Sequence, residues 1–293
     1  VGDSALILID LGQGRHRMGG SILAQAYGQV GETVPDIDRA QDLRAFFITI
    51  RTLAEAGIIL AYHDRSDGGL FATLVEMALA GHTGGSVNRD RRTFDPNSAD
   101  WGDFKIRAEQ VAVQREELTL KALFSEEAGA VIQVPMSQRD AVMQVLRGAG
   151  LSKYAHVIGG LNDGDEIEFY RDGQKIWGQP RADLGSAWSE VSREIMLLRD
   201  NPACAQAEFD VWKDAADPGL APRVTFNPQE DIAAPFIASG KRPRVAILRE
   251  QGCNSQVEMA WAFDTAGFEA VDVHMTDLLS GGADLSTVQG LVD

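Results

Sequence analysis

The chain has 293 residues, of which 44% are hydrophobic, and this length and composition suit two domains with cores of their own. Its 27 Lys and Arg against 43 Asp and Glu give a net charge of −16, which argues against nucleic-acid binding because nothing offsets repulsion from the phosphates. No apolar run approaches the length of a membrane-spanning helix, so a membrane is not an expected partner. Two lone cysteines, Cys204 and Cys253, form neither a disulfide framework nor a zinc motif, and we expect a protein of the reducing cytoplasm.

The chain opens with an apolar stretch, residues 5–11, that predicts a buried strand. The glycine-rich turn of residues 12–21 follows and leads into a helix. Such a turn can cradle phosphate, but its spacing is not that of a P-loop and no Lys-Ser or Lys-Thr pair follows. We therefore favour a tight turn with Ser21 near the helix start, and we expect His16 to be a solvated loop residue. Residues 38–57 then carry apolar side chains on one helical stripe that ends at Gly57.

The most informative stretch is the turn HDRSDGGL, residues 63–70, which lies between an apolar run and a helical pattern. A carboxylate such as Asp64 is a suitable ligand for Mg²⁺, while the Ser66 hydroxyl and free backbone N–H groups at a helix start can meet phosphate oxygens. The same residue types also serve as ordinary turn and cap chemistry. Local pattern alone leaves both interpretations open.

The middle of the chain mixes polar and apolar segments. Residues 88–118 are charged and aperiodic, which predicts a surface insertion whose Arg89, Arg91 and Arg92 form a solvated cluster or touch a phosphorylated substrate. A short helix over 120–127 ends in Glu126 and Glu127, which we expect to be solvated, with a role as site carboxylates as the alternative. Further strands are predicted at 130–134, 155–158, 166–170 and 175–177, with helices at 137–147 and 182–198.

The last part of the chain divides into a linker and a new unit. Residues 200–241 contain scattered prolines and aromatic anchors, which indicates a linker that follows a protein surface. Residues 242–293 begin a fresh strand–helix–strand pattern, the opening βαβ of a doubly wound domain. We therefore divide the chain into an α/β domain over 1–199, a linker over 200–241 and the start of a second domain over 242–293. Both chain ends look cut, so we expect a piece of a larger protein.

Seven motifs together give the chain a strong resemblance to the formylglycinamide ribonucleotide amidotransferase family, also called phosphoribosylformylglycinamidine synthase, in its large single-chain form. They cover nearly the whole sequence and are jointly specific. The motifs are DLGQG (10–14), GSILAQ (20–25), HDRSDGGL (63–70), LFSEE (123–127), LRDNP (198–202), PRVAILREQGCNS (243–255) and DVHMTDLL (272–279).

The resemblance implies a layered α/β domain like the C-terminal domain of aminoimidazole ribonucleotide synthetase, followed by the first βαβ of a flavodoxin-like class I glutamine amidotransferase domain. It implies a ligase of de novo purine biosynthesis that converts formylglycinamide ribonucleotide, ATP and glutamine to formylglycinamidine ribonucleotide, ADP, phosphate and glutamate. Its partners would be these small molecules and the rest of its own chain, with the full-length enzyme acting as a monomer.

The resemblance also assigns site residues. The family's aspartate at the position of Asp64 binds Mg²⁺, and its serine at Ser66 binds the nucleotide, ATP or ADP. We favour an auxiliary nucleotide site over the turnover site. No catalytic residue is expected in this chain, since the glutaminase Cys, His and Glu would lie beyond Asp293 and Cys253 does not match the nucleophile. The alternative is a non-catalytic, nucleotide-binding scaffold fragment; a small-molecule kinase or selenophosphate-type synthetase is a weaker rival because it carries no glutaminase domain.

Overall fold

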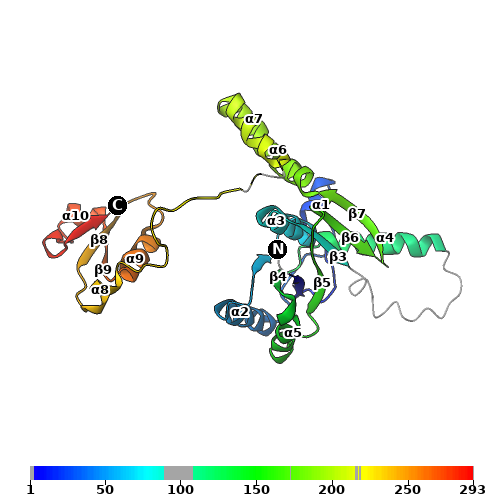
Figure 1. Ribbon diagram of the computed structural model, residues 1–293, viewed down its shortest axis with the longest axis horizontal. Coiled ribbons are helices and arrows are strands. Elements are labelled where there is room, and N and C mark those ends of the chain that lie inside the picture. The colour runs from blue at the N-terminus through cyan, green and yellow to red at the C-terminus, as the bar shows by residue number, and fades with distance from the viewer. Residues whose placement is uncertain (1–2, 89–107, 172, 215–216, 218, 293) are drawn as a thin grey trace. The chain divides into compact units, whose positions relative to one another are not determined.

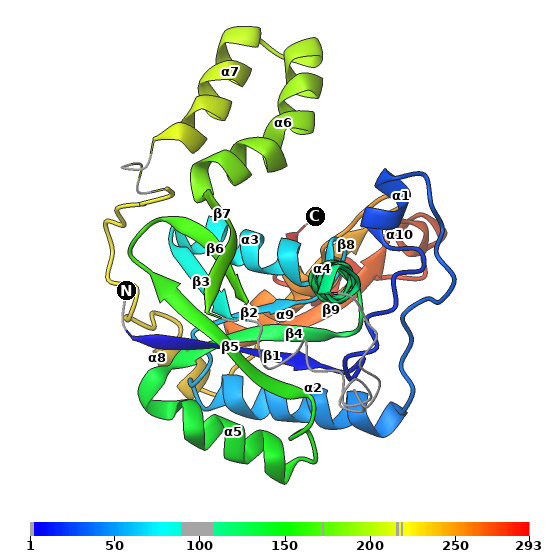
Figure 2. The same cartoon turned by 90° about the vertical axis from the view of Figure 1, so that its right-hand side faces the viewer.

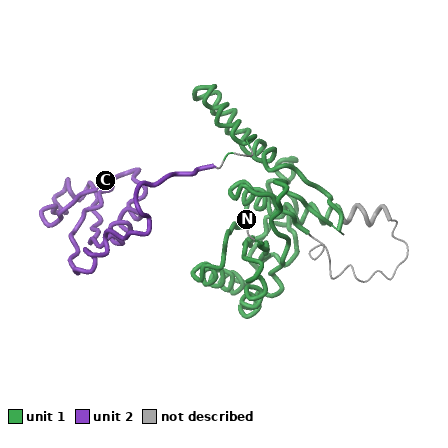
Figure 3. Tube along the Cα trace, in the orientation of Figure 1, with its two compact units in different colours: residues 1–217 green, residues 218–293 purple. Residues whose placement is uncertain are grey.

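The computed structural model describes residues 3–88, 108–171, 173–214, 217 and 219–292, with only the backbone described over 108–115. The chain forms two compact units, Val1–Asp217 and Pro218–Asp293 (Figure 3). Among the described residues, no helix is both long and apolar enough to cross a membrane.

The first unit is built on a seven-stranded sheet with the order β2-β4-β1-β5-β3-β6-β7. The interior strand β1 is buried along its whole length and pairs antiparallel with both β4 and β5. β3 and β6 are parallel, and β6 and β7 form a hairpin. The strands are β1 (Ser4–Asp10), β2 (Ala61–Asp64), β3 (Gly84–Asn88), β4 (Gly129–Pro135), β5 (Ala155–Asn162), β6 (Glu166–Arg171) and β7 (Gln174–Pro180).

Helices cover both faces of this sheet, because alternate residues of β1 are apolar on both sides (Figures 1 and 2). Ala5, Ile7 and Ile9 pack with residues of α2 and α5, whereas Leu6 and Leu8 pack with α3 and α4. The helices of this unit are α1 (Ile22–Ala26), α2 (Ala40–Glu55), α3 (Gly69–Gly81), α4 (Ala108–Phe124), α5 (Arg139–Gly148), α6 (Arg181–Arg199) and α7 (Pro202–Asp210), with short 3₁₀ turns η1 (Met136–Gln138) and η2 (Val211–Lys213).

Most predicted elements are confirmed. Helix α4 begins at Ala108, inside the stretch 88–118 that we predict to be a surface insertion without regular periodicity. Apart from Ala108, the apolar residues in its first half lie in one short run, residues 111–113, followed by the charged residues 115–117, which masks the helical pattern in the sequence; in its last turns Ala122 and Leu123 are buried. The cluster of Arg89, Arg91 and Arg92 lies outside the described residues. Strand β3 was not predicted either.

The first part of the expected linker is also folded. Asn201 caps α7 by accepting hydrogen bonds from the N–H groups of Ala203 (3.0 Å) and Cys204 (3.3 Å), and Pro202 starts the helix. Ala205 and Phe209 on α7 are buried, and the Arg193 guanidinium of α6 lies 4.4 Å from the centre of the Phe209 ring. Residues 202–213 therefore form a helical hairpin with α6.

The second unit contains a three-stranded, fully parallel sheet with the order β10-β8-β9. The first strand lies in the middle, with the second on one side and the third on the other, which is the order that starts a flavodoxin-like sheet. The predicted βαβ is thus confirmed. Its elements are α8 (Ala234–Ala238), β8 (Arg244–Arg249), α9 (Gln256–Thr265), β9 (Glu269–His274), α10 (Met275–Ser280), η3 (Leu285–Thr287) and β10 (Gly290–Val292).

Candidate functional site

Three turns meet at one end of the large sheet. We call them the glycine turn (residues 11–21, after β1), the serine turn (residues 64–69, at the end of β2) and the acidic turn (residues 125–128, before β4). Strand register brings them together: Asp10 pairs with Gly129 across β1 and β4, and Asp64 pairs with Ala130 across β2 and β4. Antiparallel pairing through β4 therefore gathers segments that are far apart in the chain.

The serine turn carries the two residues that the sequence assigned to Mg²⁺ and nucleotide. Asp64 and Ser66 are both exposed, and Arg65 between them is buried. Gly69 N–H donates to the Ser66 carbonyl oxygen at 2.9 Å, and Gly68 has φ 79° and ψ 1°, as the third residue of a type II turn does. This geometry presents the Asp64 and Ser66 side chains to solvent just before the first turn of α3.

Glycine is required at the end of the serine turn. Gly69 has φ 65°, and a Cβ there would lie 2.7 Å from the Leu123 carbonyl oxygen, inside contact distance. The serine turn is therefore packed directly on the backbone that leads into the acidic turn.

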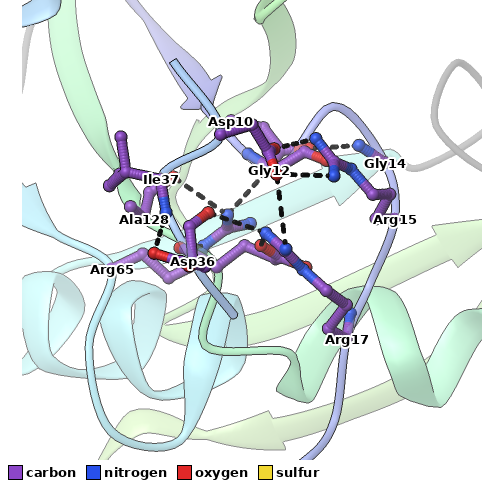
Figure 4. A network of polar contacts seen from close by, with 11 residues as sticks. Asp10, Gly12, Gly14, Arg15, Arg17, Asp36, Ile37, Arg65 and Ala128 are labelled. Carbon is purple, nitrogen blue, oxygen red and sulfur yellow. Dashed lines mark hydrogen bonds and ion pairs between the residues drawn. The ribbon is translucent and has the colours of Figure 1, made fainter. Parts of the chain in front are cut away.

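A buried ion pair joins the glycine and serine turns (Figure 4). Arg65 Nη2 donates to Asp10 Oδ1 at 2.6 Å, with the two side chains 0% and 1% exposed. Arg65 also donates through Nε to the Glu127 carbonyl oxygen and through Nη2 to the Ala128 carbonyl oxygen at 3.3 Å. Asp10 in turn accepts hydrogen bonds from the backbone of Gly12 (3.2 Å) and Gly14 (2.9 Å). One buried pair thus holds all three turns.

A second buried carboxylate, Glu127, holds the glycine turn from the other side. Its Oε1 accepts from the backbone N–H (2.9 Å) and Nε (2.8 Å) of Arg17, and its Oε2 accepts from Arg17 Nη2 at 2.6 Å. The hydrogen bond to Glu127 raises the pKa of the Arg17 guanidinium. A Cβ on Gly12 would lie 2.6 Å from Glu127 side-chain atoms, so a glycine there is needed to admit the carboxylate. The expectation that Glu127 is solvated is therefore wrong.

The neighbouring Glu126 is only partly buried, and its Oε1 accepts two backbone hydrogen bonds. One comes from Gly68 of the serine turn at 2.9 Å and the other from Ile22, the first residue of α1, at 2.8 Å. Glu126 is thus not a freely solvated helix end. It also occupies an N–H group at the start of α3 that the sequence led us to expect free for phosphate.

Backbone N–H groups of the glycine turn donate hydrogen bonds to other residues of the chain. Gly19 and Gly20 donate to the carbonyl oxygens of Thr33 and Val30, each at 2.7 Å, and Ser21 Oγ accepts from Ala24 N–H at 3.2 Å to cap α1. The tight-turn interpretation is therefore confirmed. His16 is buried in this turn, with 7% of its surface exposed, so its predicted solvation is wrong.

Comparison with known proteins identifies the family of the chain. The profile of the family described as AIR synthase related protein, C-terminal domain, matches residues 1–172. The chain belongs to that family. A second profile, described as CobB/CobQ-like glutamine amidotransferase domain, matches residues 242–292. The AIR synthase related domain thus holds the three turns, and the amidotransferase segment coincides with the parallel βαβ sheet.

Solved structures resemble the chain weakly. PurL of Thermotoga maritima complexed with ATP is 12% identical with a TM-score of 0.42, over 69% of this chain and 26% of that one. The same protein complexed with ADP is 12% identical with a TM-score of 0.42, over 91% and 32%. The hydrogenase maturation protein HypE of E. coli is 21% identical with a TM-score of 0.39, over 60% and 48%. The chain therefore spans between a quarter and half of the length of these proteins.

The donor set of the AIR synthase related domain fits one ligand of a nucleotide-bound Mg²⁺. This ion keeps several waters and takes one or two protein carboxylates beside the phosphates, which suits the exposed Asp64 next to the Ser66 hydroxyl. Over the described residues there is no cluster of three or more His, Cys, Asp or Glu that would bind a metal by itself. Cys204 on α7 and Cys253 after β8 are exposed and lie outside the three turns.

The sequence reasoning missed Asp10, Arg17 and Arg65 as structural charges of this site. A signal was present for Asp10, because an acidic residue within the apolar run of β1 needs a buried partner. Nothing local identified Arg65 as that partner.

Proposed function

We propose that this chain is part of an ATP-dependent amidotransferase that converts formylglycinamide ribonucleotide, ATP and glutamine to formylglycinamidine ribonucleotide, ADP, phosphate and glutamate. The observation that carries the proposal is that one chain holds both an AIR synthase related domain and a glutamine amidotransferase segment. A small-molecule kinase or a selenophosphate-type synthetase would carry no glutamine amidotransferase segment. The motifs that led to the family assignment in the sequence support the same activity.

Within this function, Asp64 is proposed to bind Mg²⁺ and Ser66 to donate its hydroxyl to a phosphate oxygen of ATP or ADP. The cation would neutralise part of the phosphate charge beside the positive end of α3. The chain's own contribution is to hold these two exposed side chains rigidly, through the Asp10–Arg65 pair behind them. The Gly68 and Gly69 N–H groups are already bonded, to Glu126 and to the Ser66 carbonyl oxygen, so these two amides are not offered to phosphate.

The second candidate is a scaffold that binds nucleotide and turns nothing over. The structure offers one observation in its favour: Asp10 and Glu127, the carboxylates buried at the site, are ion-paired with Arg65 and Arg17. Both carboxylates are buried and bonded to the turns that they hold, so neither is presented to a substrate. This candidate agrees with an auxiliary nucleotide site, which is the role that we favour for Asp64 and Ser66.

The first test is nucleotide binding by the chain and its Asp64→Asn variant. We expect MgADP to raise the melting temperature of the wild-type chain, because a ligand that binds only the folded state stabilises it. Asp64→Asn should weaken MgADP binding, measured by calorimetry, by about tenfold or more, which is ~1.4 kcal/mol. The control is Asp163→Asn, at an exposed position between β5 and β6. Equal MgADP affinity in wild type and Asp64→Asn would remove Asp64 from the site.

The same substitution in the full-length enzyme separates the two kinds of nucleotide site. If the site is auxiliary, Asp64→Asn should lose bound nucleotide and thermal stability while the KM for ATP changes little. If it is the turnover site, kcat should collapse while the melting temperature without nucleotide is kept. Melting temperature and ATP kinetics are measured on the same preparation.

A further inference from the structure

The Glu126 carboxylate bonds to two turns that are far apart in the sequence. Its Oε1 lies 2.9 Å from the Gly68 nitrogen and 2.8 Å from the Ile22 nitrogen, and both backbone N–H groups donate to it. Ile22 follows the glycine turn at the start of α1, and Gly68 lies in the serine turn at the start of α3. A single oxygen atom therefore bonds to the backbone of both turns.

The Gly68 N–H is the group that defines the conformation of the serine turn. Residues 66–69 close a turn through the Gly69 N–H and the Ser66 carbonyl oxygen, and Gly68 has φ 79° and ψ 1°. Type I and type II turns differ in the orientation of their central peptide, which here carries the Gly68 N–H. An acceptor placed on the side of Glu126 stabilises the type II orientation and disfavours the flipped one.

The remaining contacts of the serine turn do not duplicate this one. Arg65 N–H donates to the Gly129 carbonyl oxygen at 2.7 Å, and the Arg65 side chain bonds Asp10, so both fix the beginning of the turn. Gly69 packs on the backbone of residues 123–125 and fixes its end. The central peptide is held by Glu126.

We propose that Glu126 is a positioning residue that sets the central peptide of the serine turn and thereby the orientation of Ser66, the first residue of that turn, relative to the glycine turn. The use of this positioning in nucleotide binding rests on the proposed function. Glu126 itself is assigned no contact with the nucleotide.

Amide hydrogen exchange tests the positioning without any ligand. It is measured by NMR on the 293-residue chain for wild type, Glu126→Ala and Glu126→Gln, with Glu190→Ala at an exposed position of α6 as the matched control. In Glu126→Ala we expect the Gly68 and Ile22 amides both to exchange at least about tenfold faster, while the Gly14 amide on Asp10 keeps its rate. Glu126→Gln should lie between, because its side-chain carbonyl still accepts a hydrogen bond. A wild-type exchange rate at either amide in Glu126→Ala overturns the inference.

The affinity for MgADP then tests whether this positioning contributes to nucleotide binding. We expect Glu126→Ala to weaken MgADP binding by about tenfold and Glu126→Gln to recover part of it. Wild-type affinity in Glu126→Ala would overturn the positioning of Ser66 for nucleotide binding. Absence of MgADP binding by the wild-type chain would instead defeat the proposed function, and the exchange rates would still decide whether Glu126 orders the turn. Far-UV circular dichroism of each variant confirms that it is folded.

Discussion

At the scale of single residues, buried charge is the main feature of the three turns. Asp10, Arg65 and Glu127 are almost completely buried, and each is held by an opposite charge and by backbone groups. Such groups are tolerated inside a protein when most of their hydrogen-bonding capacity is met; Arg65 Nη1 is the exception here, since it is buried without a hydrogen-bond partner among the described residues. Their role here is to hold in fixed positions the turns on which the exposed Asp64 and Ser66 lie.

Removing one partner of the Asp10–Arg65 pair should be far more costly than removing both. Asp10→Ala leaves a buried guanidinium without its counter-charge and should lower the free energy of unfolding by about 3–5 kcal/mol. The double variant Asp10→Ala/Arg65→Met should be less destabilised than Asp10→Ala alone, because it leaves no unpaired buried charge. Urea unfolding, monitored by circular dichroism, measures the free energy of unfolding of the single and double variants.

The matched control for this prediction is Glu55→Ala, which removes the exposed ion pair of Glu55 with Arg51 on α2. A surface pair of this kind should contribute no more than about 0.5 kcal/mol. If Asp10→Ala costs no more than Glu55→Ala, the buried pair does not hold the turns.

At the scale of elements, the packing of α6 against the segment that follows α7 depends on a glycine near the start of α6. A Cβ on Gly185 of α6 would lie 2.5 Å from the Trp212 ring. Trp212 in turn makes an edge-on contact with Trp188, with ring centroids 6.3 Å apart. The close approach of the two helical segments therefore requires the missing side chain at Gly185.

Gly185→Ala should consequently destabilise the chain, although alanine is the better helix former. We expect a loss of about 1–3 kcal/mol from overpacking against Trp212. Gly148→Ala at the end of α5 is the matched control, because open space surrounds that position and the change should be neutral or stabilising by up to about 1 kcal/mol. Thermal unfolding of both variants gives the comparison, and equal effects would contradict the steric account.

The edge of the large sheet carries a pH-dependent cluster. Lys175 of β7 donates to Glu166 at 2.6 Å and to Glu168 at 2.8 Å, and Glu168 also accepts from Ser86 Oγ at 2.8 Å. The hydrogen bonds from Lys175 and then from Ser86 lower the pKa of the Glu168 carboxyl, and the bonds to Glu166 and Glu168 raise the pKa of the Lys175 ammonium. Both shifts favour the charged forms in the folded state.

The directions of these two pKa shifts predict how the free energy of unfolding changes with pH. The contribution of Glu168 is complete above the pKa of an unfolded glutamate and is lost as pH falls through the lowered folded pKa, so the loss occurs between about pH 5 and pH 3. The contribution of Lys175 is complete below the unfolded lysine pKa and is lost only at strongly alkaline pH. Glu168→Gln should therefore flatten the decline in the free energy of unfolding between pH 5 and pH 3. An unchanged slope, equal to that of wild type and of a Glu190→Gln control, would contradict this.

At the scale of the whole molecule, the two units differ in how much apolar surface they bury. In the described part of the second unit, the buried hydrophobic residues are Val245, Ala246, Ile247 and Val273. Large apolar side chains of its helices stay exposed, among them Trp261 (69%) and Leu279 (81%). A small core provides little resistance to local opening.

The amides of β8 and β9 should therefore exchange faster than those of β1 and β4. The reason is that β1 and β4 are each paired on both sides in a sheet covered by helices on both faces, whereas the parallel strands of the second unit rest on a small core. Hydrogen exchange followed by mass spectrometry on the intact chain resolves the two regions. Protection of β8 equal to that of β4 would refute the prediction.

The sequence by itself determined the elements whose burial has a clear period and the motifs that mark the family. The apolar run of β1, the stripe of α2 and the βαβ of the second unit were predicted because each residue pattern is local and repeats with the period of its element. The position of Asp64 and Ser66 at a strand–helix turn was predicted for the same reason, since a polar glycine-containing turn separates two apolar patterns.

Only the tertiary structure decided what the charges near this turn do. Arg65 meets Asp10, Arg17 meets Glu127, and Glu126 meets both Gly68 and Ile22, across separations of 55, 110, 58 and 104 residues. A charged residue looks the same in a sequence whether its partner is water or a distant side chain. The pairings follow from the position of β4 between β1 and β2, which aligns the three turns at one end of the sheet and which no local pattern encodes.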